Sequence, residues 1–248
     1  MIIATGATWA TDGLNGVSHG TIPGADVSMP HILTPEQIMG EGKRASGESV
    51  LVYDCGGHFM GASLVERPSR EGKQVTLVTP LAQVAPYTEL TLELPRIRRT
   101  LLGLGVRLVA QQEVTGIEPG RVTGCDVDAV EEKNEWDAES VVLVTQRVSN
   151  ERLFRELQEN EEVLRDQGVN GLYRIGDCVA PRLVADVIFG GRRLAREIDS
   201  ENPAESLPFI REHRVLGARD EDYDAIVRNA GGNDRPRSSL ARVPTATS

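Results

Sequence analysis

Apolar runs of strand length alternate along this chain with longer stretches whose apolar positions recur at helical spacing. Strands are predicted at 2–9, 49–55, 74–80, 135–145 and 171–178, and helices at 34–42, 58–72, 89–105, 149–168 and 181–202. Residues 106–130 alternate between apolar and polar positions and contain turn residues, which indicates a small antiparallel meander. Strand–helix–strand units around such a meander predict an α/β fold with a mostly parallel sheet and helices on both faces.

Local signals refine several of these helices. Thr34 is a suitable N-cap with Pro35 at the first helical position, and Ser149 is a plausible N-cap for the helix at 149–168. Pro68 is expected to end or kink the helix at 58–72, because proline lacks the amide donor and clashes with the preceding turn. Pro95 is expected to be a weak point of the helix at 89–105.

Composition argues against several classes of function. The net charge of −10 and the pI near 5.0 argue against a general nucleic-acid binder. The three cysteines, Cys55, Cys125 and Cys178, are far apart and form no C-x-x-C motif, which argues against a disulfide framework, a zinc site or an iron–sulfur site formed by this chain alone. No charged leader or long apolar run is present. We therefore expect a cytoplasmic protein with no membrane partner.

The stretch DCGGHFMG places a glycine-rich turn directly after a predicted strand. Gly56 and Gly61 fit the first and third positions of the G-x-G-x-x-G dinucleotide fingerprint, and Gly57 follows the first. His58 occupies the second position, where a Cβ crowds the phosphates, and the next strand ends in Thr79 rather than an acidic residue. Three readings remain open: a turn that only packs helix on strand, a nucleotide site, or a separate role for His58.

Several motifs in order resemble one known family. The segments IIATGATW, IPGAD, LTPEQ, VLVYDCGGHFMGASLVE, VTLVTP and IGDCVAPRLVADVIFGGRRLAREI are similar to the C-terminal part of the trimethylamine dehydrogenase family. That family includes dimethylamine and histamine dehydrogenases and related N-demethylases, and 2,4-dienoyl-CoA reductase is a more distant member.

The resemblance implies a Rossmann-like, two-dinucleotide-binding flavoprotein fold with one lobe incomplete. A partial FAD- or ADP-binding domain would consist of residues 1–45 and 146–215. An inserted NAD(P)-binding-like domain would span 46–145, and a flexible tail would follow at 216–248.

The resemblance also implies where cofactors lie. Thr5, Gly6, Gly176 and Asp177 would line the FAD or ADP, while Gly56, Gly57 and Gly61 form the second nucleotide loop, for which NAD(P) is disfavoured. FMN, a [4Fe–4S] cluster and the catalytic residues belong to a barrel that precedes this region in the family, so we expect no catalytic residue or metal ligand here.

Two functions follow from these features. The first is the C-terminal dinucleotide-binding portion or subunit of a flavin-dependent amine dehydrogenase or demethylase, which depends on a barrel for its chemistry. The alternative is a non-catalytic Rossmann-like interaction module, or a gene fragment, that has lost its cofactors. Because one flank of the strand at Met1–Thr5 would lack its neighbour, we expect either a barrel-bearing partner subunit or a homo-oligomer.

Overall fold

Among the described residues, the largest sheet is a five-stranded parallel sheet. The computed structural model describes residues 1–198. The strand order is β3 (Ile32–Leu33), β10 (Ser140–Val144), β4 (Ser49–Asp54), β5 (Gln74–Val78) and β6 (Arg107–Val109), with every neighbouring pair parallel. The predicted α/β fold with a parallel sheet is therefore confirmed.

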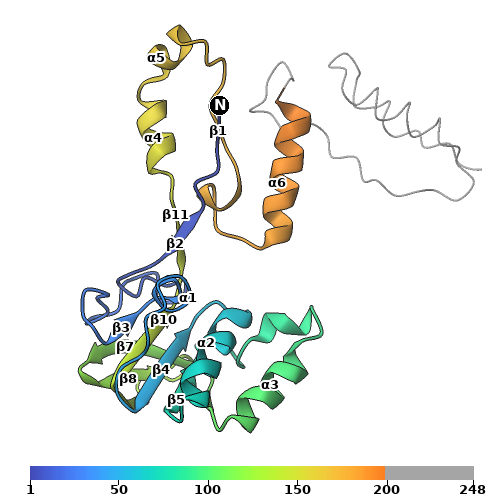
Figure 1. The fold of residues 1–248 in the computed structure, drawn as a ribbon. Helices are drawn as coiled ribbons and strands as arrows, with labels where there is room; N and C mark the ends of the chain where they lie inside the picture. The colour runs from blue at the N-terminus through green and yellow to red at the C-terminus, as the bar shows by residue number, and fades with distance from the viewer. Residues whose placement is uncertain (199–248) are drawn as a thin grey trace, which may run out of the picture. The chain divides into compact units, whose positions relative to one another are not determined.

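Different structures cover the two faces of this sheet (Figure 1). Helices α2 (Phe59–Arg70) and α3 (Leu94–Gly103) pack on one face, and the meander of β7 (Gln112–Glu118), β8 (Gly120–Asp126) and β9 (Lys133–Ala138) packs on the other. The predicted meander is confirmed. The prediction of helices on both faces of this sheet was wrong, because the meander covers one face. The meander replaces the second helical layer because it offers its own apolar face, with Val122 and Trp136, to the sheet.

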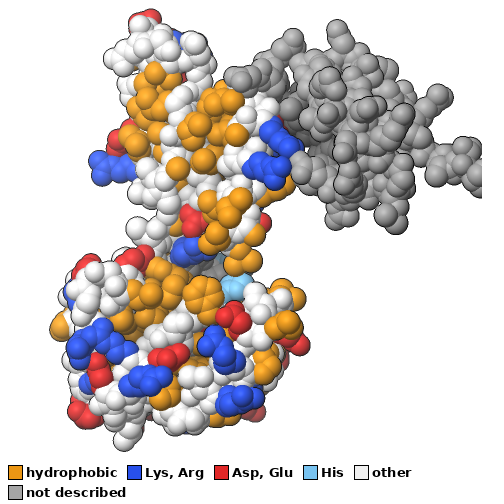
Figure 2. Space-filling model, turned by 45° about the vertical axis from the view of Figure 1, so that its right-hand side comes forward, with side chains coloured by type: hydrophobic (Ala, Val, Ile, Leu, Met, Phe, Trp, Pro, Cys, Tyr) orange, Lys and Arg blue, Asp and Glu red, His pale blue; other side chains and the backbone are white. Residues whose placement is uncertain are grey.

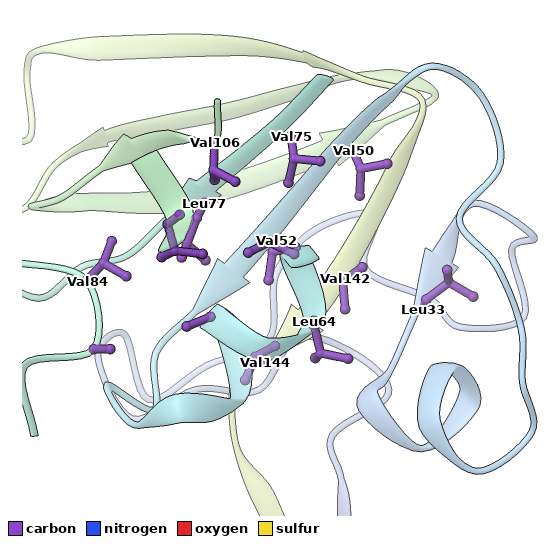
Figure 3. Packing of buried hydrophobic residues seen from close by; sticks show 14 residues of the cluster. Leu33, Val50, Val52, Leu64, Val75, Leu77, Val84, Val106, Val142 and Val144 are labelled. Atoms are coloured by element: carbon purple, nitrogen blue, oxygen red, sulfur yellow. The ribbon is translucent and has the colours of Figure 1, made fainter. Parts of the chain in front are cut away.

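The core follows the two-residue period of the strands. Val50 and Val52 of β4 point toward the helices, while Leu51 and Tyr53 point toward the meander. Both faces of β4 are thus apolar, as expected for a central parallel strand. Figure 3 shows the helical side, where residues of β4, β5 and β10 meet Leu64 of α2.

The local signals had mixed outcomes. Thr34 caps α1 (Pro35–Met39) in a capping box with Gln37, as the sequence indicated. Helix α2 continues through Pro68 to Arg70, so of the two predicted outcomes, an end or a kink, the end at the proline was wrong. Pro95 is the second residue of α3, which starts at Leu94, and its missing amide costs nothing in this first turn, so it does not interrupt the helix.

Two further strand pairs lie outside the main sheet. Strand β1 (Ile2–Ile3) pairs in parallel with β12 (Tyr173–Arg174), and β2 (Ala7–Trp9) pairs antiparallel with β11 (Arg147–Ser149). Ser149 therefore ends a strand and caps no helix.

The predicted helix at 149–168 forms two short helices, α4 (Arg152–Gln158) and α5 (Glu161–Asp166). Between them, the side chain of Asn160 donates to the carbonyl of Glu156 at 2.7 Å, a local bond that competes with helix continuation. Two short 3₁₀ helices, η1 (Pro86–Glu89) and η2 (Gly176–Cys178), complete the elements before α6.

The chain divides into two compact units, Met1–Pro181 and a second that begins at Arg182. Within the described residues, the second unit contains α6 (Val184–Glu197), which confirms a helix inside the range predicted at 181–202. The predicted tail at 216–248 lies outside the described residues. The division into domains at residues 45 and 145 stays a prediction.

The described residues contain no membrane-spanning helix, and the face drawn in Figure 2 shows no separate region of one charge. Among residues 1–198, no helix is both long and apolar enough to cross a bilayer. Figure 2 shows basic and acidic side chains interspersed around the part of the protein that contains the five-stranded sheet.

Candidate functional site

The glycine-rich turn lies where the strand order of the main sheet reverses. From β4 the chain passes to β5 and β6 on one side, while β10 and β3 lie on the other. Ligands of open α/β sheets bind at such a reversal, beyond the carboxyl ends of the strands. Strand β4 ends at Asp54, in register with Val144 at the end of β10, and residues 55–58 follow directly.

The side chain of Asp54 occupies the amide donors of this turn. Asp54 is 1% exposed, and its Oδ1 accepts hydrogen bonds from the amides of Gly56 at 2.8 Å and Gly57 at 3.3 Å. In a nucleotide-binding turn, amides of this loop face the pyrophosphate. Here a carboxylate of the same chain takes their hydrogen bonds.

Gly57 is required by close packing against a neighbouring segment. Its φ of +65° lies in the left-handed region, and an added Cβ would lie 2.5 Å from Cδ1 of Leu81 and 2.9 Å from the ring of Tyr87. The carbonyl of Gly57 also accepts a hydrogen bond from the amide of Tyr87 at 3.0 Å. This side of the turn is filled by protein.

Gly61 provides room for Asp54. A Cβ on Gly61 would lie 2.6 Å from Cγ and 2.7 Å from Cβ of Asp54, closer than ordinary contact allows. Gly61 therefore permits close packing of α2 on β4, which is the role of the third fingerprint glycine. The spacing of the motif is thus explained by helix–strand packing without any ligand.

His58 packs against an aromatic ring at the start of α2. Its ring lies 5.0 Å from the ring of Tyr87, with an interplanar angle of 38°, and its side chain makes no capping hydrogen bond. Thr79, at the position where an acidic residue would bind a ribose, is 1% exposed, and its Oγ1 accepts from the amide of Leu81 at 3.3 Å. Both side chains are engaged in local structure, so the residues at 55–61 do not fit a nicotinamide nucleotide.

Sequence reasoning missed Asp54, although the sequence carried a signal. An acidic residue stood at the end of a buried apolar strand, immediately before the glycine-rich turn. Burial raises the pKa of Asp54 to about 6, and the hydrogen bonds from Gly56 and Gly57 offset part of this rise. The second carboxylate oxygen, Oδ2, is buried and has no hydrogen-bond partner among the described residues.

The remaining predicted residues come together at a second location. Thr5 and Gly6 follow β1, and Gly176 and Asp177 lie just beyond β12, which pairs in parallel with β1 through Ile3 and Arg174. The carboxyl ends of paired parallel strands lie at one edge, so the structure brings these four residues to the same end of the pair. Gly56, Gly57 and Gly61 are not part of this group, since they follow β4 of the five-stranded sheet.

Of the four residues at the end of β1 and β12, Gly6 has open space beside its backbone. Gly6 and Gly176 have φ values of +75° and +71°, and a Cβ on Gly6 would meet no atom within 4 Å. The hydroxyl of Thr5 donates to the carbonyl of Asn150, and Asp177 forms an ion pair with Arg147 at 2.7 Å. The turn at Gly6 therefore has room for a ligand group that the turn at Gly57 lacks.

Metal and thiol chemistry find no support in the described residues. No group of three His, Cys, Asp or Glu side chains within residues 1–198 could hold a metal ion. Cys125 and Cys178 are buried, and burial raises the pKa of Cys55 to about 12, which keeps this thiol protonated at neutral pH.

A groove of about 180 Å³ between α2 and α3 is lined by both apolar and charged side chains, including Phe59, Glu66, Arg96 and Ile97. It is smaller than the roughly 300–1,000 Å³ of typical ligand pockets. It also lies between the helices rather than at the strand ends, so we assign it no ligand.

Comparison with known proteins extends these observations. A family described as the OYE-like second alpha/beta domain matches residues 33–148. Dimethylamine dehydrogenase from Hyphomicrobium sp. (strain x) is 36% identical over an alignment that covers 92% of this chain and 33% of the relative. The resemblance to the trimethylamine dehydrogenase family is confirmed.

Solved structures of this family support the same relationship. Histamine dehydrogenase from Rhizobium sp. 4-9 is 33% identical with a TM-score of 0.78, over 88% of this chain and 33% of that protein. The 6-hydroxypseudooxynicotine amine oxidase from Pseudomonas geniculata N1 is 34% identical with a TM-score of 0.70, over 77% of this chain and 28% of that protein. The chain thus spans about a third of the length of these members of the trimethylamine dehydrogenase family.

Proposed function

We propose that this chain is the C-terminal dinucleotide-binding portion of a flavin-dependent amine dehydrogenase or demethylase. The observation that supports this most directly is the identity of about a third to dimethylamine and histamine dehydrogenases across most of the chain. The Rossmann-like lobe that holds FAD or ADP is part of this proposal, as is a cytoplasmic location.

The nucleotide contacts would come from the edge formed by β1 and β12. Gly6 would allow a phosphate or ribose group to approach the backbone, since the space beside it is open. Asp177 would face a ribose or ribityl hydroxyl from the turn at Gly176, with Arg147 fixing the direction of its carboxylate. These groups bind and orient, and none of them transfers electrons.

The redox chemistry would belong to a barrel with FMN and a [4Fe–4S] cluster, which supply hydride acceptance and electron transfer when bound. That barrel lies either in the same polypeptide or in a partner subunit. The residues described here would hold a nucleotide and dock the barrel, so their contribution would be structural and positional.

A pair of matched glycine variants tests the nucleotide site. We expect weak ADP binding to the chain alone, because β1 and β12 supply only one wall, and a clear loss of affinity in Gly6→Ala. Gly42→Ala is the control, since Gly42 also has a positive φ of +72° and open space for a Cβ but lies outside the proposed site. Calorimetry of ADP and FAD binding measures the effect. Equal affinities in the two variants, or no binding to the unchanged chain, would contradict the proposed site.

The isolated 248 residues should show no amine dehydrogenase activity. The reason is that no catalytic residue of the implied barrel has a counterpart in this sequence. Dye reduction by dimethylamine or histamine, measured with the purified chain and then after addition of a barrel-bearing relative or partner, provides the check. Substrate-dependent reduction by the chain alone would show that the chemistry does not depend on a barrel.

The edge of β1 should mediate association with the barrel-bearing subunit or with a second copy. Among the described residues, β1 pairs only with β12, and Ile2 is 48% exposed. Ile2→Lys should therefore reduce self-association measured by light scattering. Leu90→Lys is the control, because Leu90 is 85% exposed and belongs to no strand. A strictly monomeric unchanged protein would contradict a homo-oligomer.

The alternative is a non-catalytic interaction module. The observation that favours it is the occupation of the Gly56 and Gly57 amides by Asp54, which shows a fingerprint loop arranged without a nucleotide. If ADP and FAD fail to bind both to the chain and to its complex with a barrel-bearing partner, the interaction module becomes the better assignment.

A further inference from the structure

We propose that Asp54 is the internal occupant of the anion-binding turn at residues 55–58 and that it excludes phosphate groups from this turn. A glycine-rich turn at the end of a central strand, followed by a helix, is a common pyrophosphate site. In this protein the carboxylate of Asp54 lies where its Oδ1 satisfies both glycine amides, so a phosphate oxygen finds neither donor free.

Charge and space both support exclusion. An approaching phosphate would meet a buried carboxylate, and like charges repel strongly when water is absent. Leu81 and Tyr87 fill the space beside Gly57, and Gly61 is small enough to let Asp54 stay in place. The turn is therefore adapted to its own side chain rather than to a ligand.

The same chain uses this kind of turn elsewhere. Oδ1 of Asn15, which is 1% exposed, accepts from the amides of Val17 and Ser18 at 2.9 and 3.0 Å. Oδ1 of Asp126, which is half-buried, accepts from Asp128 and Ala129 at 2.9 and 3.1 Å. Asn15 shows that a neutral amide supports the turn when buried, and Asp126 provides a charged control that does not precede a helix of the main sheet.

Two variants separate the effect of the charge from the effect of occupying the amides. Asp54→Ala frees the amides of Gly56 and Gly57, whereas Asp54→Asn removes the charge and keeps an oxygen that accepts from them. Inorganic pyrophosphate is the probe, and the readout is the amide resonances of Gly56 and Gly57 in the full chain. Asp126→Ala is the matched control.

We expect pyrophosphate to bind Asp54→Ala about tenfold or more tightly than the unchanged protein, a difference of about 1.4 kcal/mol. The two glycine amides should shift on binding. Asp126→Ala should behave like the unchanged protein, and Asp54→Asn should gain less affinity than Asp54→Ala, because it removes the charge but keeps an oxygen that accepts from both amides. Pyrophosphate shifts at these amides in the unchanged protein would overturn the proposal, as would a folded Asp54→Ala variant that gains no binding.

A second measurement keeps the proposal testable if Asp54→Ala does not fold. In a His58→Gln background, which removes the neighbouring imidazole, the amide shifts of Gly56 and Gly57 should move together as a single group titrates near pH 6, and the movement should be absent when Asp54→Asn is added. Cys55 stays protonated in this range, and the carboxyl group of Asp54 accepts hydrogen bonds from both amides. Amides that do not respond to pH would show that the carboxylate does not occupy the turn in solution.

Discussion

Replacing Asp54 with asparagine should stabilise the folded protein at pH 8 by about 3 kcal/mol, and the gain should vanish below about pH 3. Burial raises the pKa of Asp54 from 3.8 to about 6, and each unit corresponds to about 1.4 kcal/mol. Asparagine keeps the oxygen that accepts from Gly56 and Gly57, so the variant removes the buried charge and retains the turn.

The direction follows from which state binds the proton more tightly. Because the pKa of Asp54 is higher in the folded than in the unfolded protein, the folded state retains its proton to higher pH. Below about pH 3 both states are protonated, and this group places no penalty on folding. As the pH rises from about 3 to 6 the unfolded state ionises first, so the unchanged protein loses stability relative to the variant.

Urea unfolding at several pH values measures this difference, and the comparison removes the effects of all other titrating groups. Asp126→Asn is the control, because Asp126 forms the same turn but its Oδ2 has a partner, Nε2 of Gln112, at 2.9 Å. A pH-independent difference between Asp54→Asn and the unchanged protein would contradict the buried, ionisable carboxyl inferred here.

The sequence predicted the main sheet because its strands are apolar on both faces and bounded by turn residues. It could not show that residues 135–145 divide between two sheets. The break falls at Glu139, whose carboxylate accepts from the amides of Glu48 and Ser49 at 2.6 and 3.2 Å. This long-range contact ends β9 and begins β10, and no local pattern encodes it.

The candidate site shows a similar limit. The spacing of Gly56 and Gly61 correctly indicated a strand–turn–helix unit. His58 and Thr79 are the positions at which the sequence departs from the nucleotide fingerprint. Why the loop differs from a nucleotide site depends on which side chain accepts hydrogen bonds from its amides, and here that side chain is Asp54. Asp54 lies inside the strand pattern, and only its three-dimensional position shows that its carboxylate accepts from the amides of the loop.

A measurable packing effect is expected at Gly61. Glycine in the middle of a helix is normally less stable than alanine by about 0.5–1 kcal/mol, so propensity alone would make Gly61→Ala stabilising. The added methyl group would lie 2.6 Å from Cγ of the buried Asp54, however, and forcing an extra carbon into a packed interior costs about 1–3 kcal/mol. We therefore expect net destabilisation of about 1–2 kcal/mol in urea unfolding.

Gly103→Ala separates the packing effect from helix propensity. Gly103 is the last residue of α3, and a Cβ there would meet no atom within 4 Å, so this variant should be stabilised by up to about 1 kcal/mol. The cost of Gly61→Ala should also be smaller in an Asp54→Ala background, since Cγ and both carboxylate oxygens are then absent and only Cβ of residue 54 remains close. Equal costs in the two backgrounds would mean that Gly61 does not serve to accommodate the Asp54 carboxylate, and the glycine would need a different explanation.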